Sequence, residues 1–403
     1  METTNLDLMK EIAKTSPAKI LMLVIDGLGG IPHPASGKTE LETARTPNLD
    51  ALATESVCGL SYPISPGITP GSAPGHLSLF GYDPLAFRIG RGVLEALGVD
   101  FELEPGDVAT RGNFCTVDKD GLITDRRAGR IATEQSSELC RLLDGIEMAG
   151  IKIIVRPVKD HRFIAVFRGD ILRDDISDSD PQQTRVVPRE VIALNQPASI
   201  MAGIVNQFIE RAKDILAEHQ PANMILLRGF SRQPQFPTMA EVYKLKSAAI
   251  ASYPMYRGLA KVVGMQMLDT GKNIEDEFET LKENFSNHDF FFIHIKETDA
   301  AGEDGDFERK VAALEHLDRA LPAVTQLKPD VLVVCGDHST PAMLKGHSWH
   351  PVPLLLHSKY CRPDGVKQFS ESACLAGGLG QLKAVDIMPL AMANALKLEK
   401  FGA

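Results

Sequence analysis

Asp337 and His338 follow an apolar run, and a second histidine, His347, lies a short loop further along the chain. The run, residues 331–335, predicts a buried strand. A carboxylate at the end of an apolar strand usually has a specific role, and carboxylate and imidazole together suit Zn²⁺ or Mn²⁺. Open α/β sheets also build their sites beyond the carboxyl ends of their strands. These residues therefore predict a metal site, with His350 as a weaker alternative to His347.

Asp26 and Ser72 are two further candidates, and each has a structural alternative. Asp26 ends the apolar run 19–25 and precedes Gly27, so it fits a turn and a metal ligand equally well. Ser72 lies in a loop rich in Gly and Pro, residues 63–75, before a predicted helix. Its alternatives are a helix cap and a nucleophile, since a helix N-terminus favours an incoming phosphate.

Asp299 and Glu303 have the spacing of neighbours on one side of a helix. Further acidic residues follow directly, so one interpretation is a solvated acidic loop. The other is a metal site, because a bound divalent ion removes the repulsion between crowded carboxylates.

A group of cationic side chains lies in the middle of the chain. Guanidinium groups recognise phosphate and carboxylate through two parallel hydrogen bonds. The alternative is a solvated basic face, although the chain as a whole carries a formal charge of −10. The group consists of Arg111, Arg126, Arg127, Arg130, His161, Arg162 and Arg228.

The elements that must position these residues predict two domains. Helical segments alternate with apolar strands in residues 1–105 and 246–403, which predicts an α/β domain with a mostly parallel sheet flanked by helices. Residues 106–245 have short strands, turns and one long amphipathic helix, which predicts a smaller α+β domain inserted into the first. The inserted domain supplies the cationic group, so we expect it to bind substrate.

Composition excludes several function classes. The negative charge argues against binding to nucleic acid or to an anionic membrane surface. No apolar run approaches the roughly 20 residues of a membrane span, and the N-terminal residues do not form a signal peptide. The six cysteines form no CxxC pair, which favours reduced thiols. We therefore expect a cytoplasmic enzyme with a small-molecule substrate, and the sequence leaves its oligomeric state open.

Ordered motifs over essentially the whole chain resemble the archaeal-type, cofactor-independent phosphoglycerate mutases of the alkaline phosphatase superfamily. The longest is Thr69-Pro-Gly-Ser-Ala-Pro-Gly-His-Leu-Ser-Leu-Phe-Gly-Tyr-Asp-Pro84. The other matching segments are 26–27, 44–52, 90–98, 125–130, 161–162, 178–181, 228–229, 253–260, 294–299, 336–339 and 347–353. The resemblance implies an alkaline-phosphatase-like core with an inserted cap domain.

The resemblance also implies two divalent metal ions, Mn²⁺ or Zn²⁺, with Mg²⁺ and Co²⁺ as further candidates. One ion would be held by Asp26, Ser72, Asp337 and His338, and the other by Asp299, Glu303 and His347. The chain departs from the family pattern at Glu303, where the family usually has histidine. Because glutamate is a harder ligand, this change shifts the expected preference toward Mn²⁺. The alternative is that Glu303 turns away and that His350 or water replaces it.

The activity implied is the conversion of 3-phosphoglycerate to 2-phosphoglycerate through a phosphoserine at Ser72, without 2,3-bisphosphoglycerate. The glycerate would stay trapped under the inserted domain while it reorients. The cationic group, together with Arg257 and Lys261, would bind the substrate. Two rival functions remain: a phosphatase or another phosphomutase on the same scaffold, and a non-catalytic homologue that binds phosphosugars.

Overall fold

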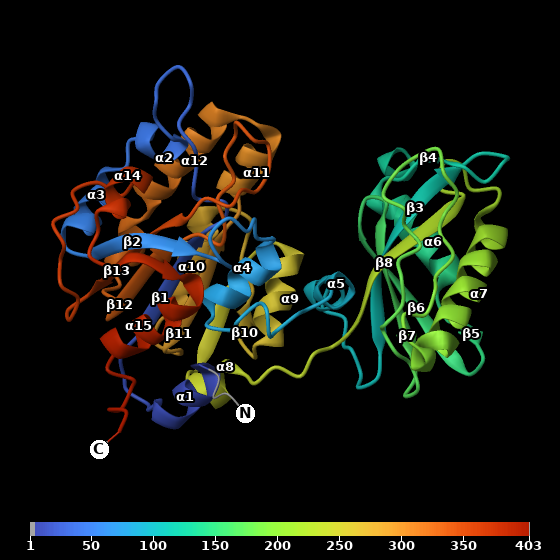
Figure 1. Cartoon of the computed structure of the whole chain (residues 1–403), viewed down its shortest axis with the longest axis horizontal. Helices are drawn as coiled ribbons and strands as arrows, with labels where there is room; N and C mark the ends of the chain where they lie inside the picture. The colour runs from blue at the N-terminus through green and yellow to red at the C-terminus, as the bar shows by residue number, and fades with distance from the viewer. Residues whose placement is uncertain (1–4, 403) are drawn as a thin grey trace. The chain divides into compact units, whose positions relative to one another are not determined.

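The computed structural model describes residues 5–402, and the chain divides into two compact units (Figure 1). The first unit comprises residues 1–88 and 236–403, and the second comprises residues 89–235. These limits differ from the boundaries expected at 105/106 and 245/246. The reason is that helix α5 (Arg91–Gly98) packs on strands of the second unit, whereas α8 (Met239–Tyr243) packs on α1 (Asn5–Ile12) of the first.

The first unit is built on a mostly parallel sheet. Its strands are β1 (Ile20–Ile25), β2 (Val57–Tyr62), β9 (Ser247–Ile250), β10 (Gln266–Leu268), β11 (Phe290–Ile295), β12 (Val331–Cys335), β13 (Val352–Ser358) and β14 (Gly380–Lys383). Within residues 5–402 the strand order is β10-β9-β11-β1-β12-β13-β2-β14. Neighbouring strands are parallel, except that β13 runs antiparallel to β12 and β2. The predicted α/β class is therefore confirmed.

Helices cover both faces of this sheet (Figure 1). Besides α1 and α8 they are α2 (Glu40–Thr43), α3 (Pro47–Thr54), α4 (Ser72–Leu79), α9 (Pro254–Val262), α10 (Ile274–Asn284), α11 (Glu297–Asp304), α12 (Phe307–Ala320), α13 (Pro322–Thr325), α14 (Glu371–Leu375) and α15 (Ile387–Asn394). Strand β11 shows how the faces divide. Phe291 and Ile293 belong to the apolar core that includes residues of α10 and α12. Phe292 instead contacts His76 of α4 and Phe80, the residue that follows this helix. This alternation follows from the two-residue repeat of a strand.

The second unit contains an antiparallel sheet with helices packed on it. Its strands are β3 (Val108–Val117), β4 (Ile123–Asp125), β5 (Ile146–Met148), β6 (Ile151–Lys159), β7 (Arg162–Arg168) and β8 (Met224–Arg232). The order is β4-β3-β7-β6-β5, and β8 pairs with β3. Together with α6 (Thr133–Leu143) and α7 (Ser199–Leu216), the sheet encloses a core of its own. The inserted α+β unit is thus as predicted. Across residues 5–402, no helix combines the length and the apolar character that crossing a bilayer requires.

Candidate active site

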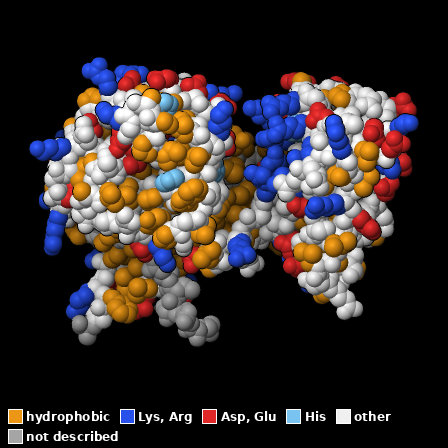
Figure 2. All heavy atoms as spheres, turned by 45° about the horizontal axis from the view of Figure 1, so that its top comes forward, with side chains coloured by type: hydrophobic (Ala, Val, Ile, Leu, Met, Phe, Trp, Pro, Cys, Tyr) orange, Lys and Arg blue, Asp and Glu red, His pale blue; other side chains and the backbone are white. Residues whose placement is uncertain are grey.

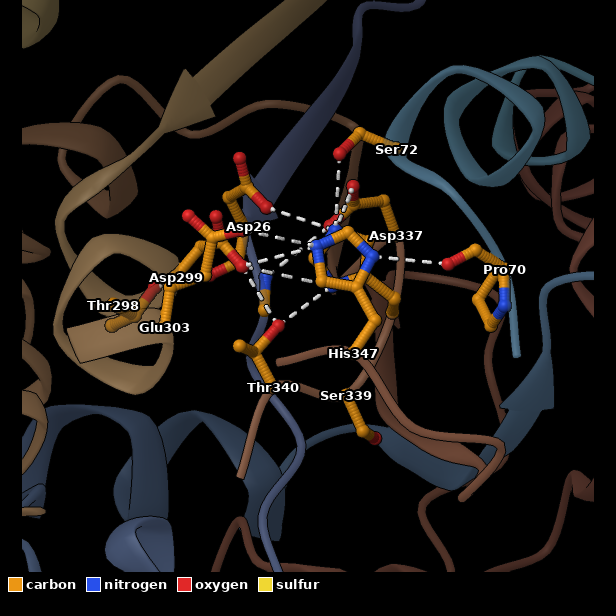
Figure 3. A network of polar contacts seen from close by, with 12 residues as sticks. Asp26, Pro70, Ser72, Thr298, Asp299, Glu303, Asp337, Ser339, Thr340 and His347 are labelled. Atoms are coloured by element: carbon orange, nitrogen blue, oxygen red, sulfur yellow. Dashed lines mark hydrogen bonds and ion pairs between the residues drawn. The ribbon is translucent and has the colours of Figure 1, made fainter. Parts of the chain in front are cut away.

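The candidate site lies at one edge of the parallel sheet, where β11, β1 and β12 end side by side. Asp26 directly follows β1, Asp337 and His338 follow β12, and Asp299 lies in the first turn of the helix after β11. All four side chains are buried. Figure 3 shows Asp26, Asp299 and Asp337 converging on the same place as His347 and Ser72. The structure therefore brings together residues that are far apart in the sequence.

His338 is the centre of one group of possible ligands, which includes Asp26 and Asp337. Its Nε2 atom lies 3.3 Å from Oδ1 of Asp26 and 3.0 Å from Oδ2 of Asp337. The same nitrogen lies 3.3 Å from the hydroxyl oxygen of Ser72. Ser72 is the first residue of α4, and Gly71 is the cap residue, so Ser72 is not the helix cap. Its hydroxyl is instead directed into the group.

The surroundings of two carboxylate oxygens show whether this group suits a cation. Asp26 Oδ1 and Asp337 Oδ2 are buried and make no hydrogen bond of good geometry among the described residues, although histidine nitrogens lie 3.3 Å from the first oxygen and 3.0 and 3.2 Å from the second. A buried carboxylate oxygen without a partner is costly, and a divalent ion would satisfy both. Two carboxylates and an imidazole are also a ligand set that Zn²⁺ and Mn²⁺ accept. The residues present therefore fit a divalent metal ion.

Electrostatic interactions keep the carboxylates of this group ionised. Burial and the charge of Asp337 raise the pKa of Asp26, but the hydrogen bond from His294 and the charge of Lys296 outweigh them and lower it. Burial also opposes ionisation of Asp337, yet His338 and His76 hold its pKa well below the usual range. Burial lowers the pKa of His338, but the charge of Asp337 raises it to about 9.

A second group consists of Asp299, His338 and His347. The Nε2 atom of His347 lies 3.6 Å from Oδ1 of Asp299, and the two histidine rings stack with their centroids 3.5 Å apart. Glu303 stands beside this group rather than within it. Its Oε1 atom is 3.9 Å from Nε2 of His347, and 55% of its side chain is exposed. His350 hydrogen-bonds Ser348 instead and is not part of the group.

Three contacts of the site were not predicted from the sequence, and all of them surround one oxygen of Asp26. Oδ2 lies 2.5 Å from the hydroxyl of Tyr256, 3.0 Å from Nε2 of His294 and 3.0 Å from Nζ of Lys296. Lys296 also contacts Oδ2 of Asp299. The signal that could have revealed two of them is a polar pair, His294 and Lys296, at the end of an otherwise apolar strand.

Three of the predicted cationic residues lie on neighbouring strands of the second unit, namely Arg111 on β3, Arg162 on β7 and Arg228 on β8. Arg111 is buried, and burial together with the charges of its arginine neighbours lowers its pKa to about 10, although Glu95 opposes this. The ion pair between Arg111 and Glu95 measures 3.1 Å. The Nε atoms of Arg111 and Arg162 have no partner among the described residues. This arrangement, which we call the arginine group, has more cations than anions and suits an anionic ligand. Figure 2 shows Lys and Arg side chains gathered on one face of the same unit.

The other predicted substrate-binding residues do not all join the arginine group. Arg126 makes two hydrogen bonds to Asp180, at 3.1 and 2.6 Å, so its guanidinium group is already paired with a carboxylate. Arg127 and Arg130 are exposed. Burial and nearby arginines lower the pKa of His161 to about 4. The last two, Arg257 and Lys261, belong to α9 in the first unit.

Comparisons with known proteins identify the family. A family model described as 2,3-bisphosphoglycerate-independent phosphoglycerate mutase matches residues 53–223. A protein from Thermus thermophilus named probable 2,3-bisphosphoglycerate-independent phosphoglycerate mutase is 48% identical over 400 residues, which cover 98% of each chain. The chain belongs to this mutase family. A protein of the same name from Thermotoga neapolitana is 49% identical and covers 99% of this chain and 100% of its own.

Solved structures agree with membership of the mutase family. The cofactor-independent phosphoglycerate mutase from Thermoplasma acidophilum is 30% identical, with a TM-score of 0.74 over 94% of this chain and 100% of its own. A protein from Pyrococcus horikoshii is also 30% identical, with a TM-score of 0.83 over 97% of this chain and 100% of its own. The resemblance of the sequence motifs to the cofactor-independent mutases is therefore confirmed.

Proposed function

We propose that the chain is an isomerase that interconverts 3-phosphoglycerate and 2-phosphoglycerate without 2,3-bisphosphoglycerate. The relatives that support this activity match along almost the full length of the chain. The observation that carries the proposal is the position of Ser72. Ser72 is the first residue of α4, and its hydroxyl oxygen lies 3.3 Å from Nε2 of His338. The buried carboxylates of Asp26 and Asp337 belong to the same group. A helix N-terminus favours phosphate, and a serine in such surroundings suits phosphoryl transfer.

Two divalent metal ions belong to the proposal. Asp26, Ser72, Asp337 and His338 would hold one ion, and Asp299 and His347 would hold the other. Bound ions of this kind supply Lewis acidity and lower the pKa of a nearby hydroxyl. Mn²⁺ and Zn²⁺ suit the ligands, and Mg²⁺ and Co²⁺ are further candidates. Because Glu303 adds a hard oxygen beside His347 at 3.9 Å, we expect Mn²⁺ to be preferred at the second site.

The proposed reaction moves one phosphoryl group twice. The Ser72 oxygen attacks the phosphorus of 3-phosphoglycerate, the bond from phosphorus to the C3 oxygen breaks, and the serine proton passes to that oxygen. Glycerate then turns, and its C2 hydroxyl attacks the phosphoserine. This second step regenerates the serine hydroxyl and forms 2-phosphoglycerate. Lys296 lies beside Asp26, where its ammonium would stabilise the negative charge that develops on the transferring group. Tyr256 donates its single hydroxyl hydrogen to Asp26 and would hold that ligand in place.

The arginine group is the feature that distinguishes a mutase from a phosphatase, because a mutase must retain the alcohol after the transfer. The substrate carries a phosphate and a carboxylate, and glycerate keeps the carboxylate after transfer. Glu95 pairs with Arg111 at 3.1 Å, and Asp180 lies 3.9 Å from Arg228 but also pairs with Arg126. The Nε atoms of Arg111 and Arg162 have no partner among the described residues, so the group retains donors that suit such an anion. A phosphatase needs only the serine and the metal ligands, because it does not have to retain the alcohol.

The compartment is part of the same proposal. We place the activity in the cytoplasm. The six cysteines are unpaired, as expected in a reducing environment.

A coupled assay tests the proposed function. Purified protein with Mn²⁺ and 3-phosphoglycerate, free of 2,3-bisphosphoglycerate, should feed enolase, and EDTA should stop the signal. Ser72→Ala should lower the rate by at least about 10⁴-fold, because it removes the nucleophile. Ser36→Ala, at an exposed loop serine, is the matched control. Full activity of Ser72→Ala would refute the phosphoserine route.

A further inference from the structure

His338 is placed between the two groups of possible metal ligands, and its two ring nitrogens face different partners. Nε2 faces Asp26, Asp337 and Ser72, whereas Nδ1 lies 3.9 Å from Oδ1 of Asp299. A histidine that binds a metal ion has given up one ring hydrogen, so one nitrogen offers a lone pair to the ion and the other carries hydrogen. The group in which His338 can act as a metal ligand therefore depends on which hydrogen-bond acceptor keeps the hydrogen at Nδ1.

The Thr340 hydroxyl lies between His338 and Asp299. Its oxygen is 2.8 Å from Nδ1 of His338 and 2.7 Å from Oδ1 of Asp299. Thr340 is fully buried, so water does not compete for these hydrogen bonds. Figure 3 shows its side chain pointing toward Asp299.

The direction of the two hydrogen bonds follows from the chemistry of the partners. Asp299 forms an ion pair with the ammonium of Lys296, and a carboxylate in such a pair only accepts hydrogen bonds. The Thr340 hydroxyl must therefore donate its single hydrogen to Asp299. Its oxygen can then only accept from His338, so Nδ1 carries the hydrogen and the lone pair lies at Nε2.

We propose that Thr340 is a positioning residue that commits His338 to the ligand group of Asp26 and Asp337. With hydrogen at Nδ1, the ring is not a ligand for the group of Asp299 and His347. The same hydroxyl orients Asp299, so one side chain orients a ligand of each group. Hydrogen-bond partners of metal ligands typically change metal affinity by about 10- to 100-fold when they are removed.

The backbone around Thr340 holds this hydroxyl in place. The Thr340 amide donates to the carbonyl of Gly29, and its own carbonyl accepts from the ammonium of Lys310 at 2.9 Å. Lys310 is fully buried on α12 and donates to Gly29 as well. A Cβ atom at Gly302 would come within 2.2 Å of the Thr340 carbonyl oxygen, so α11 lies against the same residue. Thr340 is thus fixed by the loop after β1, by α11 and by α12.

Metal binding by paired variants tests the role of Thr340. Thr340→Val keeps the shape but loses the hydroxyl, and Thr340→Ser keeps the hydroxyl. Titration of the metal-free protein with Mn²⁺, followed by calorimetry, should give a dissociation constant at least about 10-fold weaker for Thr340→Val. Thr340→Ser should restore binding to within about 3-fold of wild type, which loss of packing alone does not explain. Wild-type affinity and stoichiometry in Thr340→Val would overturn the proposal.

A measurement on the wild-type protein covers the case in which Thr340→Val fails to fold. Nitrogen NMR of ¹⁵N-histidine-labelled, Zn²⁺-loaded protein should show the His338 hydrogen at Nδ1, with His338→Gln assigning the signal. Hydrogen at Nε2 would refute the assignment.

The inference rests on the proposed metal site, and the experiments separate the two. If the wild-type protein bound no Mn²⁺, both the metal site and the role of Thr340 would be wrong. If the wild-type protein bound Mn²⁺ and Thr340→Val did so equally well, only the role of Thr340 would be wrong.

Discussion

Asp26 is held by one of its oxygens and presents the other. Oδ2 receives contacts from Tyr256, His294 and Lys296, whereas Oδ1 has no hydrogen-bond partner among the described residues. Charge-assisted hydrogen bonds are the strong ones, so this anchoring fixes the carboxylate orientation. Oδ1 faces His338 at 3.3 Å, as a metal ligand would require.

Lys296→Met should lower kcat for mutase activity by about 10²-fold, which is a typical cost of removing one group that stabilises developing charge. The change removes the ammonium that contacts Asp26 and Asp299. The enolase-coupled assay measures kcat and KM separately. Lys282→Met, at an exposed lysine of α10, is the control and should leave both constants unchanged. Activity of Lys296→Met within twofold of wild type would contradict a catalytic role.

At the residue scale, polar residues that follow apolar strands can be recognised from the sequence. Asp26 and Asp337 could be predicted because each ends such a strand, and burial makes an unpaired carboxylate costly there. Tyr256 and Thr340 could not be predicted, because their roles depend on neighbours that only the fold brings within hydrogen-bond distance. Glu303 matched the predicted helical spacing with Asp299, yet its side chain remains largely exposed.

At the scale of elements, the register of three parallel strands aligns the site. Ile25 of β1 pairs with Ile295 of β11, and Val24 pairs with Cys335 of β12, so the three strands end at nearly the same level. Residues just beyond these ends must then lie close together. The apolar runs predicted the strands. A strand that is buried on both faces is apolar throughout, so its sequence does not indicate which strands lie beside it or in which direction they run. For this reason the sequence predicted neither the strand order nor the antiparallel β13.

Glu277 on α10 should make stability depend on pH. Burial raises the pKa of its carboxyl group to about 8, and the charges of Glu297 and Asp276 add to this. The folded protein therefore binds more protons than the unfolded chain between the ordinary glutamate pKa and pH 8. The free energy of unfolding should fall as pH rises through this range, and the full loss should be present above pH 8.

Glu277→Gln should remove this decrease in the free energy of unfolding at high pH. At pH 9 the variant should be more stable than wild type by on the order of 5 kcal/mol, and near pH 4 the two should be similar. Urea unfolding at both pH values measures the difference. Glu279→Gln, at an exposed position of the same helix, should behave as wild type. Parallel pH profiles of Glu277→Gln and wild type would show that Glu277 does not titrate as described.

At the scale of the whole molecule, the candidate metal ligands and the arginine group belong to different compact units. The change from alternating helices and strands to short strands indicated the insertion. The sequence did not indicate that α5 belongs with the inserted unit. An amphipathic helix looks the same whichever sheet it packs on, and only its contacts with β3 and β8 assign it.

Metal removal should destabilise the first unit and leave the second unchanged. Binding to the folded state alone adds about 2.7 kcal/mol to the free energy of unfolding when free Mn²⁺ is at 100 times its Kd. Hydrogen exchange with and without EDTA should therefore show faster exchange in β1, β11 and β12, and unchanged exchange in β6 and β7. The last two strands are the internal control. Equal loss of protection in both units would contradict a metal site confined to the first.

The most direct test of the central claim is the fate of the phosphoryl group. We would supply 3-phosphoglycerate with ¹⁸O in its non-bridging phosphoryl oxygens, omit 2,3-bisphosphoglycerate, and follow the products by mass spectrometry. The mutase account predicts 2-phosphoglycerate that retains all the label, with little free phosphate. Labelled inorganic phosphate as the main product would contradict it and identify the chain as a phosphatase.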